Sequence, residues 1–126
     1  MRKTGILGAT VVALTLAFAG VALAAVINGN NANNELYGTN GADTIRGFGG
    51  VDDLYGRGGG DLLIGGTGQD DYYGGPGNDR IRAVDNSPDD IVCGDGFDRV
   101  TANPGEDVAR NCERVVRQGS NQPDPD

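Results

Sequence analysis

The chain has 126 residues, with 23 glycines, two cysteines, no histidine, no tryptophan and a formal net charge of −8. Without histidine it lacks the base of the common nucleophilic mechanisms, and it cannot complete a zinc site from four nitrogen and sulfur ligands. The acidic balance argues against nucleic acid and anionic membranes as partners and favours cations. Aromatic residues make up only 6%, so a metal or a disulfide is expected to help stabilise the fold.

Residues 1–24 have the three parts of a secretory signal peptide. Arg2 and Lys3 precede an apolar run over residues 5–23, and Ala22-Leu23-Ala24 is a small-x-small cleavage site. The alternative is a membrane anchor, because the run is about long enough to span a bilayer, but its glycines and the cleavage site disfavour this. We therefore predict cleavage after Ala24, a secreted protein with a formal charge of −10, and no membrane insertion of the mature chain.

Six nine-residue blocks follow one another without a gap from Gly29 to Arg82. Position one is always Gly, and position six is Asn34 in the first block and Asp in the other five. Position eight is always large and apolar, being Leu36, Ile45, Leu54, Leu63, Tyr72 and Ile81. An internal repeat of this kind predicts a fold of stacked units.

Each block divides into a turn and a short strand. Positions one to six have turn chemistry, with Gly where positive φ is needed. Positions seven to nine, such as Thr44–Arg46, place the apolar middle residue inward. Three residues cannot form a strand alone, so they must pair with the equivalent residues of another block. The Asn-rich first block is expected to be an atypical end repeat.

After the sixth block the register slips by one residue. If Ala83 is an insertion, Val84–Val92 forms a seventh block without glycines and Cys93–Thr101 forms an eighth. Residues 106–117 fit either a strand or one face of a helix, and their β-branched residues favour a strand. The tail, residues 118–126, is predicted to be disordered.

The carboxylates at position six predict a metal. Ligand sets made only of oxygen select hard cations, and Ca²⁺ tolerates irregular coordination better than Mg²⁺. The alternative is that these Asp residues only cap turns. Stacked strands lie about 4.8 Å apart, so each like-charge contact would cost about 1 kcal/mol in water and ~3 kcal/mol at an effective dielectric of 20. Because the carboxylates form a lattice and not one unusual pair, we do not expect an enzyme.

Two blocks, Gly65–Tyr73 and Gly74–Arg82, resemble the RTX (repeats-in-toxin, haemolysin-type) calcium-binding nonapeptide. The resemblance implies an all-β fold, a right-handed parallel β-roll or β-solenoid over residues 25–117, in which two nonapeptides make one turn. Calcium, about 3–5 ions, would lie between loops of alternate nonapeptides on the same edge. One edge would hold Asp43, Asp61, Asp79 and Asp98, and the other Asn34, Asp52, Asp70 and Asp89. The ligands implied are these aspartates and the glycine-loop residues Gly41, Gly49, Gly50, Gly58, Gly59, Gly66, Gly68, Gly75 and Gly77.

The two cysteines, Cys93 and Cys112, bracket the last segment. An even count in a secreted protein predicts a bridge, while an intermolecular bridge and free thiols remain alternatives. Closing a loop of about 20 residues would stabilise the fold by about 3 kcal/mol. The block that begins with Cys93 and the later Cys112-Glu113 pair also resemble a pattern of secreted calcium-binding proteins.

These features predict a secreted calcium-binding protein whose folding is coupled to calcium. The alternative is a calcium-rigidified, adhesin-like surface module that binds a glycan or another cell-surface partner. Tyr37, Tyr55 and Tyr73 lie 18 residues apart and would form a ladder on one face, where they either support the sheet or act as an aromatic platform.

Overall fold

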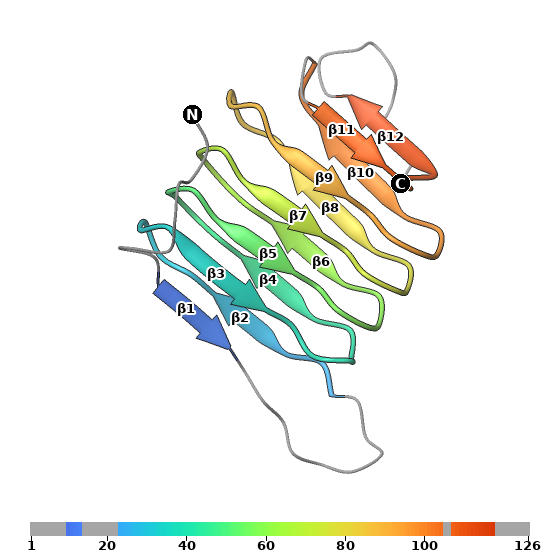
Figure 1. Cartoon of the computed structure of the whole chain (residues 1–126), viewed down its shortest axis with the longest axis horizontal. Helices are drawn as coiled ribbons and strands as arrows, with labels where there is room; N and C mark the ends of the chain where they lie inside the picture. The colour runs from blue at the N-terminus through green and yellow to red at the C-terminus, as the bar shows by residue number, and fades with distance from the viewer. Residues whose placement is uncertain (1–9, 14–22, 105–106, 118–126) are drawn as a thin grey trace.

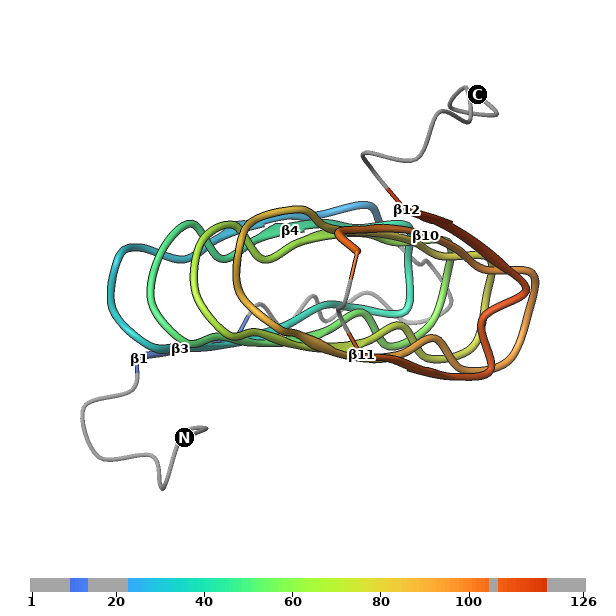
Figure 2. The ribbon, with the colours of Figure 1, turned by 90° about the horizontal axis from the view of Figure 1, so that it is seen from above.

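Short parallel strands wind into a flattened solenoid with a sheet on each side (Figure 1). The structure, a computed structural model, describes residues 10–13, 23–104 and 107–117, and its regular elements there are all strands. In this part of the chain no helix is long and apolar enough to cross a membrane. Seen from above, the two sheets face one another and the turns close the tube at both edges (Figure 2). The predicted all-β, parallel β-solenoid is confirmed.

The odd-numbered strands form one sheet, called sheet A here, and the even-numbered strands form sheet B. Sheet A contains β1 (Thr10–Ala13), β3 (Asn34–Tyr37), β5 (Asp53–Tyr55), β7 (Asp71–Tyr73), β9 (Asp90–Val92) and β11 (Asp107–Arg110). Sheet B contains β2 (Val26–Asn28), β4 (Thr44–Arg46), β6 (Leu62–Ile64), β8 (Arg80–Ala83), β10 (Arg99–Ala102) and β12 (Arg114–Arg117).

The pairing register follows the nine-residue repeat. In sheet A, Leu36 lies beside Leu54 and Leu54 beside Tyr72, so equivalent residues two blocks apart are neighbours. Sheet B shows the same relation between Ile45 and Leu63. Each strand of three or four residues is therefore stabilised by parallel pairing to its own repeat in the turns before and after it.

The core is thin, because each block contributes one inward side chain at position eight. The position-eight side chains of all six blocks are between 0% and 2% exposed. Tyr72 is the largest of them, and its hydroxyl accepts a hydrogen bond from Gly65 N at 3.0 Å and donates one to Arg82 O at 3.4 Å. A polar atom in this core is thus hydrogen-bonded to the backbone on both sides.

The predicted register slip is confirmed. Tyr72 lies beside Ile91, and Ile81 beside Val100, one residue beyond the regular spacing. Ala83 ends β8 beside Ala102 of β10, and both side chains are fully buried. The extra residue therefore extends a strand by one small buried side chain, and the solenoid continues past it.

The two ends of the solenoid differ from the repeat. Ile27 of β2 is 3% exposed and lies beside Ile45, so the solenoid begins before the first predicted block. At the other end, β11 and β12 confirm the predicted strand structure. Within the predicted signal peptide, Thr10–Ala13 forms β1 beside β3. The rest of that leader up to residue 22, and the tail predicted to be disordered, lie outside the described residues.

Candidate metal centre

Along each edge of the solenoid, hydrogen bonds link the position-six residues of successive turns into a row, called a file here. Asp61 Oδ1 accepts a hydrogen bond from Asp43 N at 2.8 Å, and Asp79 Oδ1 accepts one from Asp61 N at 2.8 Å. The same contact joins Asn34 N to Asp52 Oδ1, Asp52 N to Asp70 Oδ1, Asp70 N to Asp89 Oδ1 and Asp79 N to Asp98 Oδ1. The structure thus brings the predicted aspartates together in the two predicted files.

Whereas Asp43 Oδ2 accepts a hydrogen bond from Thr39 N at 2.6 Å, the second oxygen of most of these carboxylates is buried and accepts none. Among the described residues this holds for Oδ2 of Asp52, Asp61, Asp70, Asp79, Asp89 and Asp98. A buried acceptor without a partner costs about 1–3 kcal/mol, and more when it is charged. The repetition of this arrangement in successive turns fits a cation that is bound by oxygen ligands.

The position-one glycines reveal where Oδ2 lies. A Cβ at Gly56 would lie 2.5 Å from Asp61 Oδ2 and 2.7 Å from Gly74 O. A carboxylate oxygen and a backbone carbonyl oxygen therefore line the space that a side chain would fill. The same pairing of Oδ2 with a carbonyl oxygen recurs at Gly38, Gly47 and Gly74. These glycines were absent from the predicted ligand set, although their unbroken column is visible in the sequence.

The donor set fits a hard cation held mainly by the backbone. Nowhere in the described ranges does a group of three or more acidic or cysteine side chains assemble that could hold a metal ion. An ion would then need carbonyl oxygens of the loops beside its aspartates. Calcium accepts such a mixture of carboxylate and carbonyl oxygens, with irregular geometry.

The predicted loop glycines fall into two groups. A Cβ at Gly59, where φ is 83°, would lie 2.5 Å from Gly41 O of the turn before, so only glycine fits this close stacking. Positive φ is shared by Gly50, Gly66, Gly68, Gly75 and Gly77. It is not found at Gly41, Gly49 or Gly58, and a Cβ at Gly58 would meet its nearest neighbour at 3.3 Å. Gly49 and Gly58 are therefore less tightly constrained by their surroundings, whereas a Cβ at Gly41 would clash with Leu23 O.

Burial makes the aspartates poor anions in the absence of a cation. Burial, the largest cause, and the charges of Asp79 and Asp43 raise the pKa of Asp61 to about 8, although the hydrogen bond from Asp43 N opposes the shift. The pKa of Asp70 is likewise raised to about 8, and that of Asp79 to about 7, chiefly by burial. A bound cation would favour the ionised carboxylates and remove this penalty.

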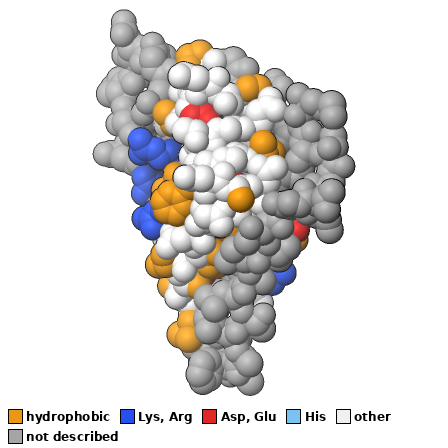
Figure 3. Space-filling model, turned by 90° about the vertical axis from the view of Figure 1, so that its left-hand side faces the viewer, with side chains coloured by type: hydrophobic (Ala, Val, Ile, Leu, Met, Phe, Trp, Pro, Cys, Tyr) orange, Lys and Arg blue, Asp and Glu red, His pale blue; other side chains and the backbone are white. Residues whose placement is uncertain are grey.

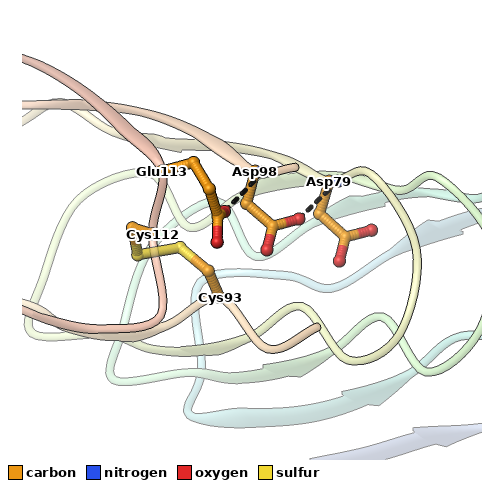
Figure 4. Close-up of a disulfide and its surroundings, with 5 residues drawn as sticks. All are labelled: Asp79, Cys93, Asp98, Cys112 and Glu113. Atoms are coloured by element: carbon orange, nitrogen blue, oxygen red, sulfur yellow. Dashed lines mark hydrogen bonds between the residues drawn. A yellow bond between two sulfur atoms is a disulfide. The ribbon is translucent and has the colours of Figure 1, made fainter. Parts of the chain in front are cut away.

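The C-terminal end of one file is closed by a glutamate beside a disulfide (Figure 4). Glu113 Oε2 accepts a hydrogen bond from Asp98 N at 2.8 Å, where a further position-six aspartate would be expected. Cys93 and Cys112 form the predicted intramolecular disulfide, with Cα atoms 5.2 Å apart. Glu113 was not predicted as a site residue, although Glu113-Arg114-Val115 has the acidic-x-apolar pattern of a repeat.

At the N-terminal end of the same file, Ala25 N donates a hydrogen bond to Asp43 Oδ1 at 2.8 Å. Ala25 is 8% exposed and Asp43 is 2% exposed. Ala25 thus takes the place of a position-six residue without supplying a carboxylate. The file therefore has carboxylates from Asp43 onward and ends at Glu113.

The tyrosine ladder is present on sheet A. The ring centroids of Tyr37 and Tyr55 are 4.8 Å apart and those of Tyr55 and Tyr73 are 4.7 Å apart, with interplanar angles of 8° and 5°. The guanidinium of Arg57 lies 5.3 Å from the Tyr37 centroid. The ring faces are therefore turned toward one another along the sheet.

Comparison with known families agrees with the site. Residues 28–63 and 49–81 match the family model of the RTX calcium-binding nonapeptide repeat, with four copies. No curated protein matches the chain. The matched span contains the regular blocks, whose buried aspartates and glycine loops are described above. Residues 28–81 of this chain are therefore RTX calcium-binding nonapeptide repeats, wound into a parallel β-solenoid.

Proposed function

We propose that this protein is a secreted, non-catalytic calcium-binding β-solenoid whose folding is coupled to calcium. The observation that carries the proposal is the buried Oδ2 of Asp61 and of Asp79, which lies beside a backbone carbonyl oxygen and has no hydrogen-bond donor. A cation between these oxygens would replace repulsion by attraction. The carboxylates lie in regular files and not in one convergent group, which supports a structural role for calcium over a catalytic one.

We place about 3–5 ions in the two files, on the spacing of their aspartates and the RTX motif. The steps from Asp43 to Asp61, from Asp61 to Asp79 and from Asp52 to Asp70 have the regular spacing and glycine loops. The steps that reach Asp89 and Asp98 contain the inserted residue, and the loop before Asp89 has no glycine. The three regular steps are the strongest candidates for calcium sites.

The coupling of calcium binding to folding follows from the sizes of the free-energy contributions. The core is a single file of side chains, and the glycine loops lose much backbone entropy on ordering. Each ion adds about 2.7 kcal/mol at a hundredfold excess over its dissociation constant, so three to five ions supply about 8–13 kcal/mol. This is comparable to the stability of an ordinary domain. Extracellular calcium modules bind at about 10⁻⁴–10⁻³ M, so secretion would itself switch the fold on.

A calcium titration followed by far-UV circular dichroism and calorimetry tests this function. We expect little β signal in a chelator and a cooperative gain of β signal on adding calcium. The calcium midpoint should be the same for the binding heat and for the β signal. Magnesium at equal concentration should give a much smaller gain, because it demands octahedral geometry and dehydrates reluctantly. A full β signal in the chelator, or no heat on adding calcium, would refute the proposal.

Secretion is proposed from the leader and is tested separately. The hydrogen bond from Ala25 N to Asp43 is compatible with cleavage after Ala24, because the new N-terminus keeps its nitrogen as a donor. Cleavage would also remove Thr10–Ala13 and free the edge of β3. N-terminal sequencing of the exported protein should begin at or near Ala25. Recovery of a membrane-bound product that still begins at Met1 would contradict it.

We do not base a function on the tyrosine ladder. A sugar-binding platform needs open ring faces, whereas both faces of Tyr55 are covered by Tyr37 and Tyr73. Stacked aromatic neighbours on adjacent strands stabilise a sheet by about 0.2–1 kcal/mol per pair. The ladder geometry therefore supports structural stacking over the adhesin-like alternative built on these rings.

A further inference from the structure

The solenoid separates its charges by sheet. Because successive blocks alternate between the sheets, outward positions form columns along each face. The strands of sheet B contain no Asp or Glu, and their arginines are Arg46, Arg80, Arg82, Arg99, Arg114 and Arg117. The strands of sheet A contain Arg110 as their one base, and their acidic residues are Glu35, Asp53, Asp71, Asp90 and Asp107. A protein that is acidic as a whole thus has one basic face.

Three of these arginines form a continuous column. Arg80 of β8 lies beside Arg99 of β10, which lies beside Arg114 of β12. Adjacent strands are about 4.8 Å apart, and like charges at that spacing repel by about 1 kcal/mol in water. The fold does not require arginine there, since the same position holds Thr44 in β4 and Leu62 in β6. The column therefore concentrates three guanidinium groups on one face, where they can contact an anionic partner.

The column is accessible. Arg80 and Arg114 are exposed and Arg99 is half-buried, while Arg82 beside them on β8 is also exposed. Figure 3, which views the solenoid from one side, shows basic side chains at the surface, with the larger group along one margin and a smaller group on the opposite side. The acidic column of sheet A lies on the other layer, about 10 Å away, and the Debye length at physiological salt is about 8 Å. Its charge is therefore largely screened at the outer face of sheet B.

The chemistry of the face selects the partner. Guanidinium groups pair in bidentate fashion with carboxylate, sulfate and phosphate groups. An even row of them along the axis fits a polymer that carries anions at regular intervals. No strand of sheet B contains an aromatic residue, so the face has no platform on which nucleic-acid bases could stack. A second copy of this chain is a poorer fit, because much of the acidic column of sheet A is only partly accessible: Asp53 is 8% exposed, and Glu35 and Asp71 are half-buried.

We propose that the outer face of sheet B binds an extended anionic polysaccharide, carboxylated or sulfated, lying along the axis across β8, β10 and β12. Arg80, Arg99 and Arg114 supply the central contacts, and Arg82 widens the site. The proposal rests on the proposed calcium function only in requiring a folded solenoid. It is independent of the tyrosine ladder, which lies on sheet A.

The test uses the full chain at saturating calcium and three polymers with one backbone: dextran sulfate, carboxymethyl dextran and unmodified dextran. Binding is followed by calorimetry at several salt concentrations, and folding by circular dichroism. We expect the parent protein to bind one or both anionic dextrans in a salt-dependent manner and to ignore the neutral one. The double variant Arg99→Gln/Arg114→Gln should lose at least tenfold in affinity and show a weaker salt dependence.

The matched control is Arg57→Gln/Arg110→Gln, which removes the same charge outside sheet B and should bind like the parent. Equal losses in the two double variants would overturn the proposal, since net charge alone would explain them. Failure of the parent to bind either anionic dextran would also overturn it. Equal, arginine-dependent binding to duplex DNA would overturn the choice of a polysaccharide. A normal calcium-induced β signal in all variants separates these outcomes from a failure of the calcium function.

Discussion

The side chain of Glu113 accepts a hydrogen bond from the backbone nitrogen of Asp98. Elsewhere in the file, this acceptor is the aspartate of the next turn. Its Oε2 accepts the hydrogen bond from Asp98 N at 2.8 Å, as Asp98 Oδ1 does from Asp79 N. The neighbouring disulfide, Cys93–Cys112, holds Glu113 near the last full turn (Figure 4). The C-terminal cap therefore copies the repeat with a longer side chain from outside the regular blocks.

Removing this cap should lower stability modestly. Glu113→Ala leaves Asp98 N without its acceptor, and we expect a loss of about 1 kcal/mol in the free energy of unfolding at saturating calcium. Glu113→Gln keeps a side-chain oxygen and should lose less. Chemical denaturation measures both, with Glu35→Ala on the outer face of sheet A as the control. Equal losses for Glu113→Ala and Glu35→Ala would show that the hydrogen bond is not responsible.

The position of an aspartate in its file should decide its effect on calcium binding. Asp61 accepts from Asp43 and donates to Asp79, so it belongs to two successive steps. Asp61→Ala is therefore expected to raise the calcium midpoint of the far-UV signal more than Asn34→Ala, which changes only a neutral end residue. Asp90→Asn, an exposed charge on β9, should leave the midpoint unchanged. Equal midpoints for the Asp61 and Asn34 variants would argue against linked sites.

Acid should favour the metal-free fold. The pKa values of Asp61 and Asp70, raised to about 8 from an ordinary value of 3.8, mean that the folded chain binds more protons than the unfolded chain between these limits. The free energy of unfolding without calcium must then fall as pH rises from about 4 to about 8. We expect more β signal in a chelator at about pH 5 than at about pH 8.

Calcium should reverse this trend, because the ion needs ionised carboxylates and competes with protons for them. The calcium midpoint is therefore expected to rise as pH falls through the same window. Circular dichroism against pH, with and without calcium, measures both trends. A metal-free β signal that stays constant or grows with pH would contradict the role assigned to the buried aspartates.

The position-one glycines should be less tolerant of substitution by alanine than those at position three. In Gly56→Ala the new Cβ would press on Asp61 Oδ2 and Gly74 O, the two oxygens proposed to face an ion. We expect a large rise in the calcium midpoint or loss of the transition. Gly58→Ala, whose Cβ would meet Asn40 at 3.3 Å, should have a small effect. Calcium titrations of the two variants measure this difference. A larger rise in the calcium midpoint for Gly58→Ala than for Gly56→Ala would place the ion nearer to position three.

The sequence was sufficient to predict everything that repeats. Its nine-residue period assigns Ile45 and Leu63 to the core, places Asp43 and Asp61 on the same edge, and locates the slip at Ala83. Such predictions succeed because each block is surrounded by copies of itself, so one local rule governs all of them. The two cysteines left their pairing open, and the fold decided it by bringing them within reach of each other.

The tertiary structure alone decided what lies at the ends and between the turns. Ala25 and Glu113 close one file because the first and last turns lack a neighbour and must use whatever group the chain places there. That Asp61 Oδ2 lies beside Gly56 and faces Gly74 O depends on how consecutive turns stack, which a list of residue types does not specify. The basic character of sheet B likewise emerged only once alternate strands were assigned to opposite faces, because net charge averages over both.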